Sequence, residues 1–348
     1  MTTPSLAHIL ATTPILQAPM AGATNVDTVI AAQQAGALGA LGAGMMSPAQ
    51  IHQAISDIKA RTDAPFCVNL MVLSDDATSQ YSQAMPTWLS ELYQSLDVVP
   101  SLDDKPAHSF GEQFQVLLDN PVSIASFTFG IISTGQMAAL KAVGTLVIGT
   151  ANHPDEVLAW SALGADAVII QGAEAGGHRG GWLCESDMPL VLAELFSQTK
   201  QCLTQENIDT PIIVAGGIAD RAQVVRYLSA GAAAVVVGTA FLSTVESCIS
   251  PIWKQRLLAG GETQLTRLYS GKLARGLVTE YMQQFAHLDG LERHDQLPVY
   301  PTLNAMTKSL RAHGTKTANS ELMSLWAGAN VGACRDETMA ALVGRLVM

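Results

Sequence analysis

The chain has 348 residues, of which 48% are hydrophobic and 14% charged, with 29 glycines and a formal net charge of −11. Such a length and composition suit one large, well-buried α/β domain or two ordinary ones. The acidic balance argues against nucleic acid or an anionic membrane as a partner, since both favour a basic surface. No apolar run reaches the ~18 residues of a membrane span, and no secretory signal precedes residue 20.

The cysteines show neither a CxxC motif nor the spacing of a metal site. They are Cys67, Cys184, Cys202, Cys248 and Cys334. An odd, scattered set is typical of reduced thiols, so we expect a cytoplasmic protein without a bound metal. A homodimer remains open.

Short apolar runs alternate with helical patterns along most of the chain. We expect strands at residues 14–20, 37–44, 66–72, 122–130, 144–150, 166–172, 211–217 and 233–241. Most of these runs are apolar throughout, as in strands that are covered on both faces. Helical patterns lie between them, with Ser47 and Asp220 as expected N-caps and Gly36, Gly164 and Gly231 just after helix ends. Eight such units in series predict a (β/α)8 TIM barrel rather than a doubly wound open sheet.

Two segments do not follow this repeat. Residues 73–120 are too long for one crossover and contain three prolines, so we expect a mostly helical insertion after the third strand. From about residue 250 the alternation stops. We therefore predict a barrel over residues 1–250 and a C-terminal helical segment over 251–348 that packs on it as a lid.

In a barrel of this type, the active site lies at the C-terminal ends of the strands. The residues expected there are small or carry neutral amides: Met20, Ala21, Gly22, Asn69, Met71 and Gln171. They include no pair of carboxylates and no cluster of metal ligands. This lining suits a planar, neutral or anionic cofactor that is held by backbone amides.

Two neighbouring loops indicate a phosphate site. Gly216 and Gly217 follow the seventh strand, and Gly238 and Thr239 follow the eighth. Barrel enzymes often bind phosphate there through backbone N–H groups, although glycines that only permit tight turns would give the same pattern. Neither GxxxxGK nor a GxGxxG after the first strand is present, which disfavours an NTP or a Rossmann-bound dinucleotide.

His178 lies in the glycine-rich loop "QGAEAGGHRGG" (residues 171–181), directly after the sixth strand. Imidazole can change its charge near neutral pH, which suits proton transfer or stabilisation of an anion. The alternative is a structural histidine that caps a turn. Glu174 is expected either to orient His178 or to form an ion pair with Arg179.

Several motifs resemble those of the nitronate monooxygenase family, formerly called 2-nitropropane dioxygenases. They are "QAPMAGATN", "VNLMV", "QGAEAGGHRGG", "IVAGGIAD", "VVVGTAFLSTVES" and "YSGKLARGL", which span about residues 14–280. The resemblance implies an FMN-binding barrel in which the backbone of Met20, Ala21 and Gly22 lines the flavin. It also implies that Asn69 and Gln171 hydrogen-bond the ring, that Gly176 lies beside it, and that Gly216, Gly217, Gly238 and Thr239 hold the phosphate. His178 corresponds to the family's catalytic histidine.

One position departs from the family pattern. The chain has "FTFG" at 127–130, where nitronate-oxidising members have Phe-His-Phe-Gly. Thr128 can hydrogen-bond but cannot carry charge, so we expect an altered substrate pocket. Tyr300 and Lys308 resemble the aromatic and basic residues of the family's C-terminal segment, and we expect both to reach this pocket.

By resemblance, the leading hypothesis is FMN-dependent oxidation of alkyl nitronates by O2 to a carbonyl compound and nitrite, with nitroalkanes as further substrates. The flavin would supply the redox chemistry, and the protein would supply orientation and electrostatics. The alternative is an NAD(P)H-dependent reductase of quinones or enoyl thioesters on the same fold. A non-catalytic flavin-binding protein is a third reading, which His178 argues against.

Overall fold

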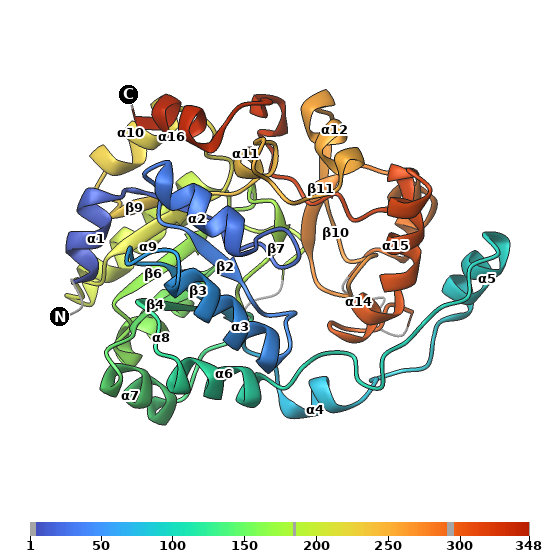
Figure 1. Cartoon of the computed structure of the whole chain (residues 1–348), viewed down its shortest axis with the longest axis horizontal. Helices are drawn as coiled ribbons and strands as arrows, with labels where there is room; N and C mark the ends of the chain where they lie inside the picture. The colour runs from blue at the N-terminus through green and yellow to red at the C-terminus, as the bar shows by residue number, and fades with distance from the viewer. Residues whose placement is uncertain (1–4, 184–185, 291–295, 348) are drawn as a thin grey trace.

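The computed structural model describes residues 5–183, 186–290 and 296–347. Eight parallel strands form a nearly closed barrel in the order β1-β9-β8-β6-β5-β4-β3-β2. Helices surround these strands, and the C-terminal segment lies beside one end of the barrel (Figure 1). The strands are β1 (Ile15–Gln17), β2 (Ala40–Gly42), β3 (Cys67–Met71), β4 (Ile124–Thr128), β5 (Leu146–Ala151), β6 (Ala167–Gln171), β8 (Ile212–Ala215) and β9 (Ala234–Val237). All eight predicted strands are present, and the predicted (β/α)8 barrel is confirmed.

The seam between β1 and β2 is closed by a single bridge and a buried amide. Leu16 and Leu38 form the isolated parallel bridge, and the N–H of Gln17 donates to the Leu38 carbonyl at 3.0 Å. The side-chain oxygen of Gln17 accepts from the N–H of Ala40 at 3.3 Å. The Gln17 side chain thus replaces the ladder bonds that these short strands do not make.

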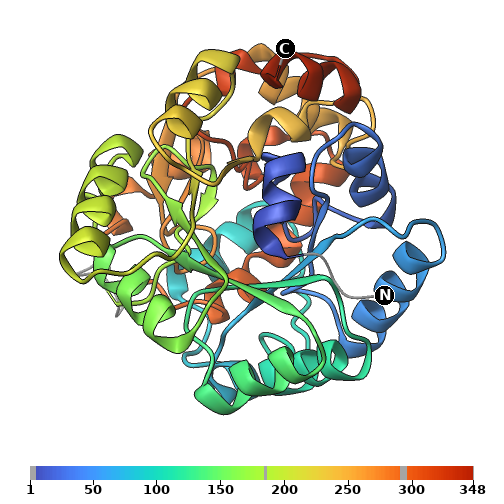
Figure 2. The same cartoon turned by 90° about the vertical axis from the view of Figure 1, so that its left-hand side faces the viewer.

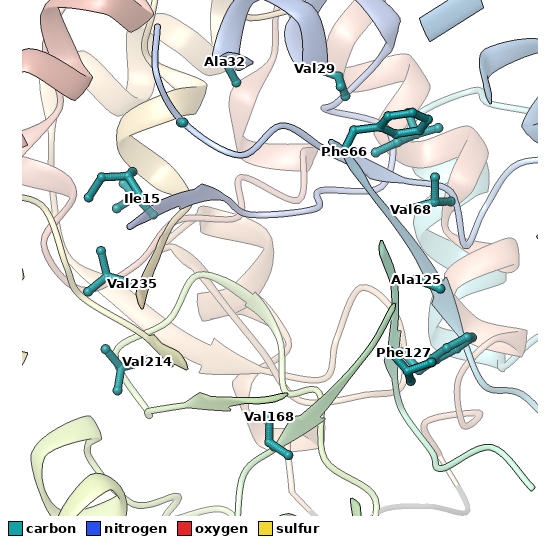
Figure 3. Packing of buried hydrophobic residues seen from close by; sticks show 14 of the residues in the cluster. Ile15, Val29, Ala32, Phe66, Val68, Ala125, Phe127, Val168, Val214 and Val235 are labelled. Atoms are coloured by element: carbon teal, nitrogen blue, oxygen red, sulfur yellow. The ribbon is translucent and has the colours of Figure 1, made fainter. Parts of the chain in front are cut away.

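The strands alternate between two apolar layers. Ile15, Val168, Val214 and Val235 point outward to the layer shared with the helices (Figure 3). Their neighbours in sequence point into the barrel, where the packed residues include Leu16, Ile169, Ile213 and Val236. Helix α1 (Leu6–Thr12) lies across the end of the barrel where the strands begin, and it buries Leu6, Ile9 and Leu10 against the interior (Figure 2). One end of the barrel is therefore plugged, and a ligand must enter from the other.

The outer helices begin and end where the local sequence predicts. They are α2 (Val26–Gln34), α3 (Pro48–Lys59), α6 (Phe110–Asp119), α7 (Thr134–Ala142), α8 (Pro154–Leu163), α9 (Leu192–Gln205), α10 (Arg221–Ser229) and α16 (Met339–Val347). The side chains of Ser47 and Asp220 cap α3 and α10 as expected. Gly164 ends α8 in a left-handed conformation.

The predicted insertion after β3 contains α4 (Asp75–Ser79) and α5 (Thr87–Ser95) ahead of α6. Helix α5 packs against the C-terminal segment, with Leu89 and Tyr93 buried beside Tyr269 and Tyr281. The hydroxyl of Tyr93 donates to the carbonyl of Met306 at 2.7 Å. The insertion and the C-terminal segment therefore share an apolar cluster that is separate from the core of the barrel.

The C-terminal segment contains strands in addition to the predicted helices. The short helix α11 (Thr239–Leu242) follows β9 and precedes this segment. The elements of the segment are α12 (Pro251–Ala259), β10 (Thr263–Thr266), β11 (Ala274–Leu277), α13 (Glu280–Gln284), η1 (Ala286–Leu288), α14 (Thr302–Met306), α15 (Lys308–Lys316), η3 (Ser320–Leu322) and η4 (Val331–Ala333). Strands β10 and β11 form a sheet with β7 (Gly177–His178). Helix α16 then returns to the barrel, where Met339, Leu342 and Leu346 join its outer core. The boundary at residue 250 stays a prediction.

Within the described ranges, no helix combines the length and the apolar character that crossing a membrane requires. The thiols of Cys67, Cys202, Cys248 and Cys334 are free, whereas Cys184 lies outside the described residues.

Candidate active site

A cavity of about 420 Å³ lies at the C-terminal ends of the barrel strands. Its far wall is formed by the C-terminal segment, which covers this end of the barrel (Figure 1). All residues predicted for the site line the cavity except Lys308. The residues that are spread from position 20 to position 300 in the sequence therefore meet in one place.

The loops after β8 and β9 present free backbone donors to this cavity. Gly216 and Gly217 have φ angles of +126° and +66°, which side-chain-bearing residues rarely adopt. In the part of the chain that the structure describes, the N–H groups of Gly216, Gly217, Gly238 and Thr239 donate to no other group. Unpaired amides on two adjacent loops fit a phosphate, whose oxygens only accept hydrogen bonds.

A second group of residues forms the base of the cavity. Gly22, with φ +77°, shapes the turn after β1, which the N–H of Ala23 closes onto the Met20 carbonyl at 2.9 Å. Asn69 donates its amide N–H to Ser126 at 2.9 Å, which leaves its side-chain oxygen for a ligand. A planar ring system could lie against these backbone and amide groups, and the donor set fits a flavin.

The side chain of Gln171 forms hydrogen bonds to protein groups that the sequence does not predict. Its Nε2 donates to the carbonyl of His178 at 2.9 Å, and its Oε1 accepts from the N–H of Gly180 at 2.8 Å. Asn152 also donates to Oε1, at 3.1 Å. Gln171 therefore fixes the histidine loop, and its contact with a flavin ring stays a prediction.

The histidine loop is attached to the C-terminal segment as a strand. His178 pairs with Ala274 across the β7–β11 ladder, and the N–H of Arg179 donates to the Leu273 carbonyl at 2.8 Å. A Cβ on Gly176 would lie 2.6 Å from the carbonyl carbon of Ala327. Glycine at 176 is thus required by the close approach of the C-terminal backbone.

Neither predicted role of Glu174 matches the contacts in the structure. Its carboxylate accepts from the N–H of Leu192 at 2.8 Å, and the guanidinium of Arg179 donates to the carbonyls of Gln171 and Gly172. Both side chains therefore stabilise the loop backbone and leave His178 to other partners.

The His178 ring packs among three aromatic side chains and forms a hydrogen bond to the hydroxyl of Ser270. Its Nε2 lies 2.8 Å from Ser270 Oγ, and the rings of Phe129, Tyr300 and Trp326 approach it edge-on at 5.7, 5.6 and 5.2 Å between centroids. Ser270 donates its hydroxyl proton to the Lys272 carbonyl at 3.1 Å. With its proton donated to that carbonyl, the hydroxyl oxygen accepts the proton of Nε2, and on this basis we assign the lone pair of the ring to Nδ1.

Burial, together with the smaller effect of the positive charges of Lys272 and Arg311, lowers the pKa of His178 to about 3. The imidazole is therefore neutral at physiological pH. A neutral ring with an unprotonated Nδ1 can accept a proton, but it does not offer a positive charge to an anion.

Thr128, the position that departs from the family, belongs to the same network. Its hydroxyl donates to the carbonyl of Gly180 at 3.2 Å, and the N–H of Phe129 donates to that carbonyl at 2.7 Å. Phe129 has φ +72°, an uncommon conformation for a residue with a side chain, and such residues often lie at functional sites. No sequence signal marks Phe129, because neighbouring strands and loops impose this conformation.

The prediction that Lys308 reaches the pocket is wrong. Its Nζ lies 2.7 Å from Asp103 at the surface, where the Lys308 side chain is 60% exposed. Arg311, which is one turn further along α15, lines the cavity together with Asn304 and Trp326. Sequence reasoning missed these three residues because the positions of α14, α15 and the loop that carries Trp326 depend on how the segment packs.

The model of the family described as "Nitronate monooxygenase" matches residues 3–348 of this chain. A probable nitronate monooxygenase of Staphylococcus haemolyticus is 32% identical, over 96% of this chain and 93% of that protein. One from Bacillus subtilis is 34% identical, over 94% and 92%.

Among solved structures, a nitroalkane oxidase from Streptomyces ansochromogenes superposes with a TM-score of 0.82 at 32% identity, covering 96% of this chain and 94% of that one. FabK from Thermotoga maritima superposes with a TM-score of 0.75 at 24% identity, covering 98% and 94%, and this likeness concerns the fold alone.

Proposed function

This chain belongs to the nitronate monooxygenase family and is a flavin-dependent oxidoreductase, and we propose that it uses FMN and O2 to oxidise alkyl nitronates to a carbonyl compound and nitrite. The observation that supports this proposal best is the position of His178. A neutral imidazole with a free Nδ1 lines a cavity whose other walls suit a flavin. Such a group can take a proton from a neutral nitroalkane, which converts the nitroalkane into its nitronate.

The residues that would hold the cofactor divide into two groups. The loops of Gly216, Gly217, Gly238 and Thr239 would bind the phosphate through their free N–H groups. The backbone of Met20, Ala21 and Gly22, the side chains of Asn69 and Gln171, and the loop at Gly176 would border the ring. FMN is proposed rather than FAD because the sequence offers one phosphate site and no second nucleotide-binding motif. When bound, the flavin supplies the electron-transfer chemistry toward O2.

The protein's own groups orient the substrate and handle its proton. Ser270 holds the His178 ring through Nε2, so that Nδ1 remains the basic atom. Phe129, Tyr300 and Trp326 surround the ring with apolar edges and limit the access of water. After Nδ1 has accepted a proton from carbon, the resulting N–H can donate to an oxygen of the nitronate.

The proposal is tested by identifying the flavin and the oxidant together. We expect the purified protein to be yellow, to release FMN on denaturation, and to produce nitrite from an alkyl nitronate only when O2 is present. Without O2, the nitronate should change the flavin spectrum, whereas NADPH should not bleach it rapidly.

Each alternative gives a different result in the same experiment. Rapid bleaching by NADPH without oxygen, together with no nitrite from any nitronate, would support a reductase instead. FAD in the supernatant would contradict the proposal that the cofactor is FMN. If neither the nitronate nor NADPH changes the flavin spectrum, the protein binds flavin without catalysing either reaction.

A further inference from the structure

Arg311 is an unpaired cation in a cavity that otherwise lacks charge. Among the described residues, it is the only Lys, Arg, Asp or Glu that lines the cavity. Tyr300, Tyr93, Tyr281, Tyr269 and His178 interact with it electrostatically, and no described carboxylate forms a salt bridge with it. Burial lowers the pKa of Arg311, but a guanidinium starts from so high a value that it keeps its charge.

The guanidinium is positioned by two backbone carbonyls. Nη2 donates to Asn304 at 2.6 Å, and Nε donates to Thr307 at 3.4 Å. These bonds use two of the five N–H groups of an arginine, so that about three remain for a ligand. In the described part of the chain, Nη1 donates to no protein group. The head group is thus fixed by its own segment while one edge stays available.

Arg311 is half-buried, and a cation that is partly withdrawn from water without a counterion is costly unless a ligand supplies the negative charge. The planar fork of arginine matches a planar group with two oxygens, because two parallel N–H groups can donate to the two oxygens. A nitronate carries such an O–N–O group with a full negative charge. His178 cannot compensate this charge, since its ring is neutral before it accepts a proton.

We propose that Arg311 is the residue that binds the planar oxyanion of the substrate. This inference rests on the proposed function for the identity of the substrate as a nitronate. The presence of an anion site at Arg311 rests only on the unpaired guanidinium and its place on the cavity wall.

The test compares Arg311→Met and Arg311→Gln with Lys308→Met in the flavin-loaded protein. Lys308→Met removes a positive charge from the same helix and is the matched control, since Lys308 pairs with Asp103 at the surface. Nitrate, a planar oxyanion that is not oxidised, serves as the binding probe, and its Kd is read from the change in the flavin spectrum. Steady-state kinetics use a simple alkyl nitronate without a second charge, and the parent nitroalkane.

Hydrogen bonds to charged groups contribute about 1.5–3 kcal/mol, which corresponds to roughly a 10- to 100-fold effect. We expect both Arg311 variants to weaken nitrate binding by this factor and to raise the KM for the nitronate. For the neutral nitroalkane we expect a lower kcat with little change in KM, because charge develops only in the transition state. Lys308→Met should leave all of these values unchanged.

Three results would overturn the proposal. Wild-type nitrate affinity in both Arg311 variants would mean that the guanidinium binds no oxyanion. Equal rises in KM for the nitronate and the neutral nitroalkane would indicate a structural role. Weaker nitrate binding in Lys308→Met alone would assign the anion site to Lys308 instead. If the wild type oxidises no nitronate, the proposed function fails, whereas Arg311-dependent nitrate binding would still support the anion site.

Discussion

Replacing His178 by glutamine should make the stability of the protein less sensitive to acid. The folded-state pKa of His178 is lowered to about 3, whereas an unfolded histidine has a pKa near 6.5. Between these values the unfolded chain binds a proton that the folded protein does not bind. The free energy of unfolding therefore falls as the pH drops below 6.5, and this loss is complete only near pH 3.

The size of the effect follows from the two pKa values. From pH 7.5 to pH 5.0, His178 should lower the free energy of unfolding by about 2 kcal/mol. This change in free energy depends little on the folded-state pKa of His178, because that pKa lies well below 5.0. Glutamine can keep a hydrogen bond to Ser270 but does not titrate, so the variant should lack this contribution.

Urea unfolding of both proteins, followed by circular dichroism at the two pH values, measures the difference. The midpoints convert to free energies provided that the slopes agree. The wild type should lose about 2 kcal/mol more than His178→Gln on going to pH 5.0. If the two proteins lose the same free energy to within about 0.5 kcal/mol, His178 is not held neutral by burial, and its assignment as a ready proton acceptor is wrong.

Three further substitutions test the site. His178→Ala should reduce kcat/KM for a neutral nitroalkane by ~10²–10⁴-fold and for the preformed nitronate by much less, and equal losses would exclude proton abstraction. Gly217→Val should abolish FMN retention, because valine strains the backbone at this positive φ. The control Gly231→Val has a similar positive φ but lies away from the cavity, so it should keep its flavin, as measured by the ratio of flavin to protein absorbance. Gly176→Ala should destabilise the protein by about 1–3 kcal/mol in urea unfolding, because its Cβ would lie 2.6 Å from Ala327, and an unchanged midpoint would contradict that close approach.

The barrel was predictable because each strand carries its own signal. Runs such as 166–172 and 211–217 are apolar and bounded by turns, so local sequence and global fold agree. The phosphate loops and His178 follow directly from those strands, and the structure places them on one cavity. Their proposed roles toward FMN and substrate still await the experiments above.

The rest of the site depends on packing that the local sequence does not encode. Lys308 and Arg311 lie one turn apart on α15, and only the packing of this helix within the C-terminal segment decides which of them faces the cavity. Strands β10 and β11 are short and contain polar residues, and β7 has two residues within a glycine loop. These strands form because they pair with one another, so neither alternation nor propensity predicts them.

The return of α16 to the barrel imposes an order on biosynthesis. The ribosome completes β9 at Val237, but the helix that covers the adjoining outer surface begins at Met339, after the whole C-terminal segment. Until then, the apolar sites that later receive Leu342 and Leu346 face solvent on the nascent chain. We expect the emerging barrel to need chaperone protection through this interval, and a chain that stops before residue 339 to aggregate rather than accumulate as a shortened enzyme.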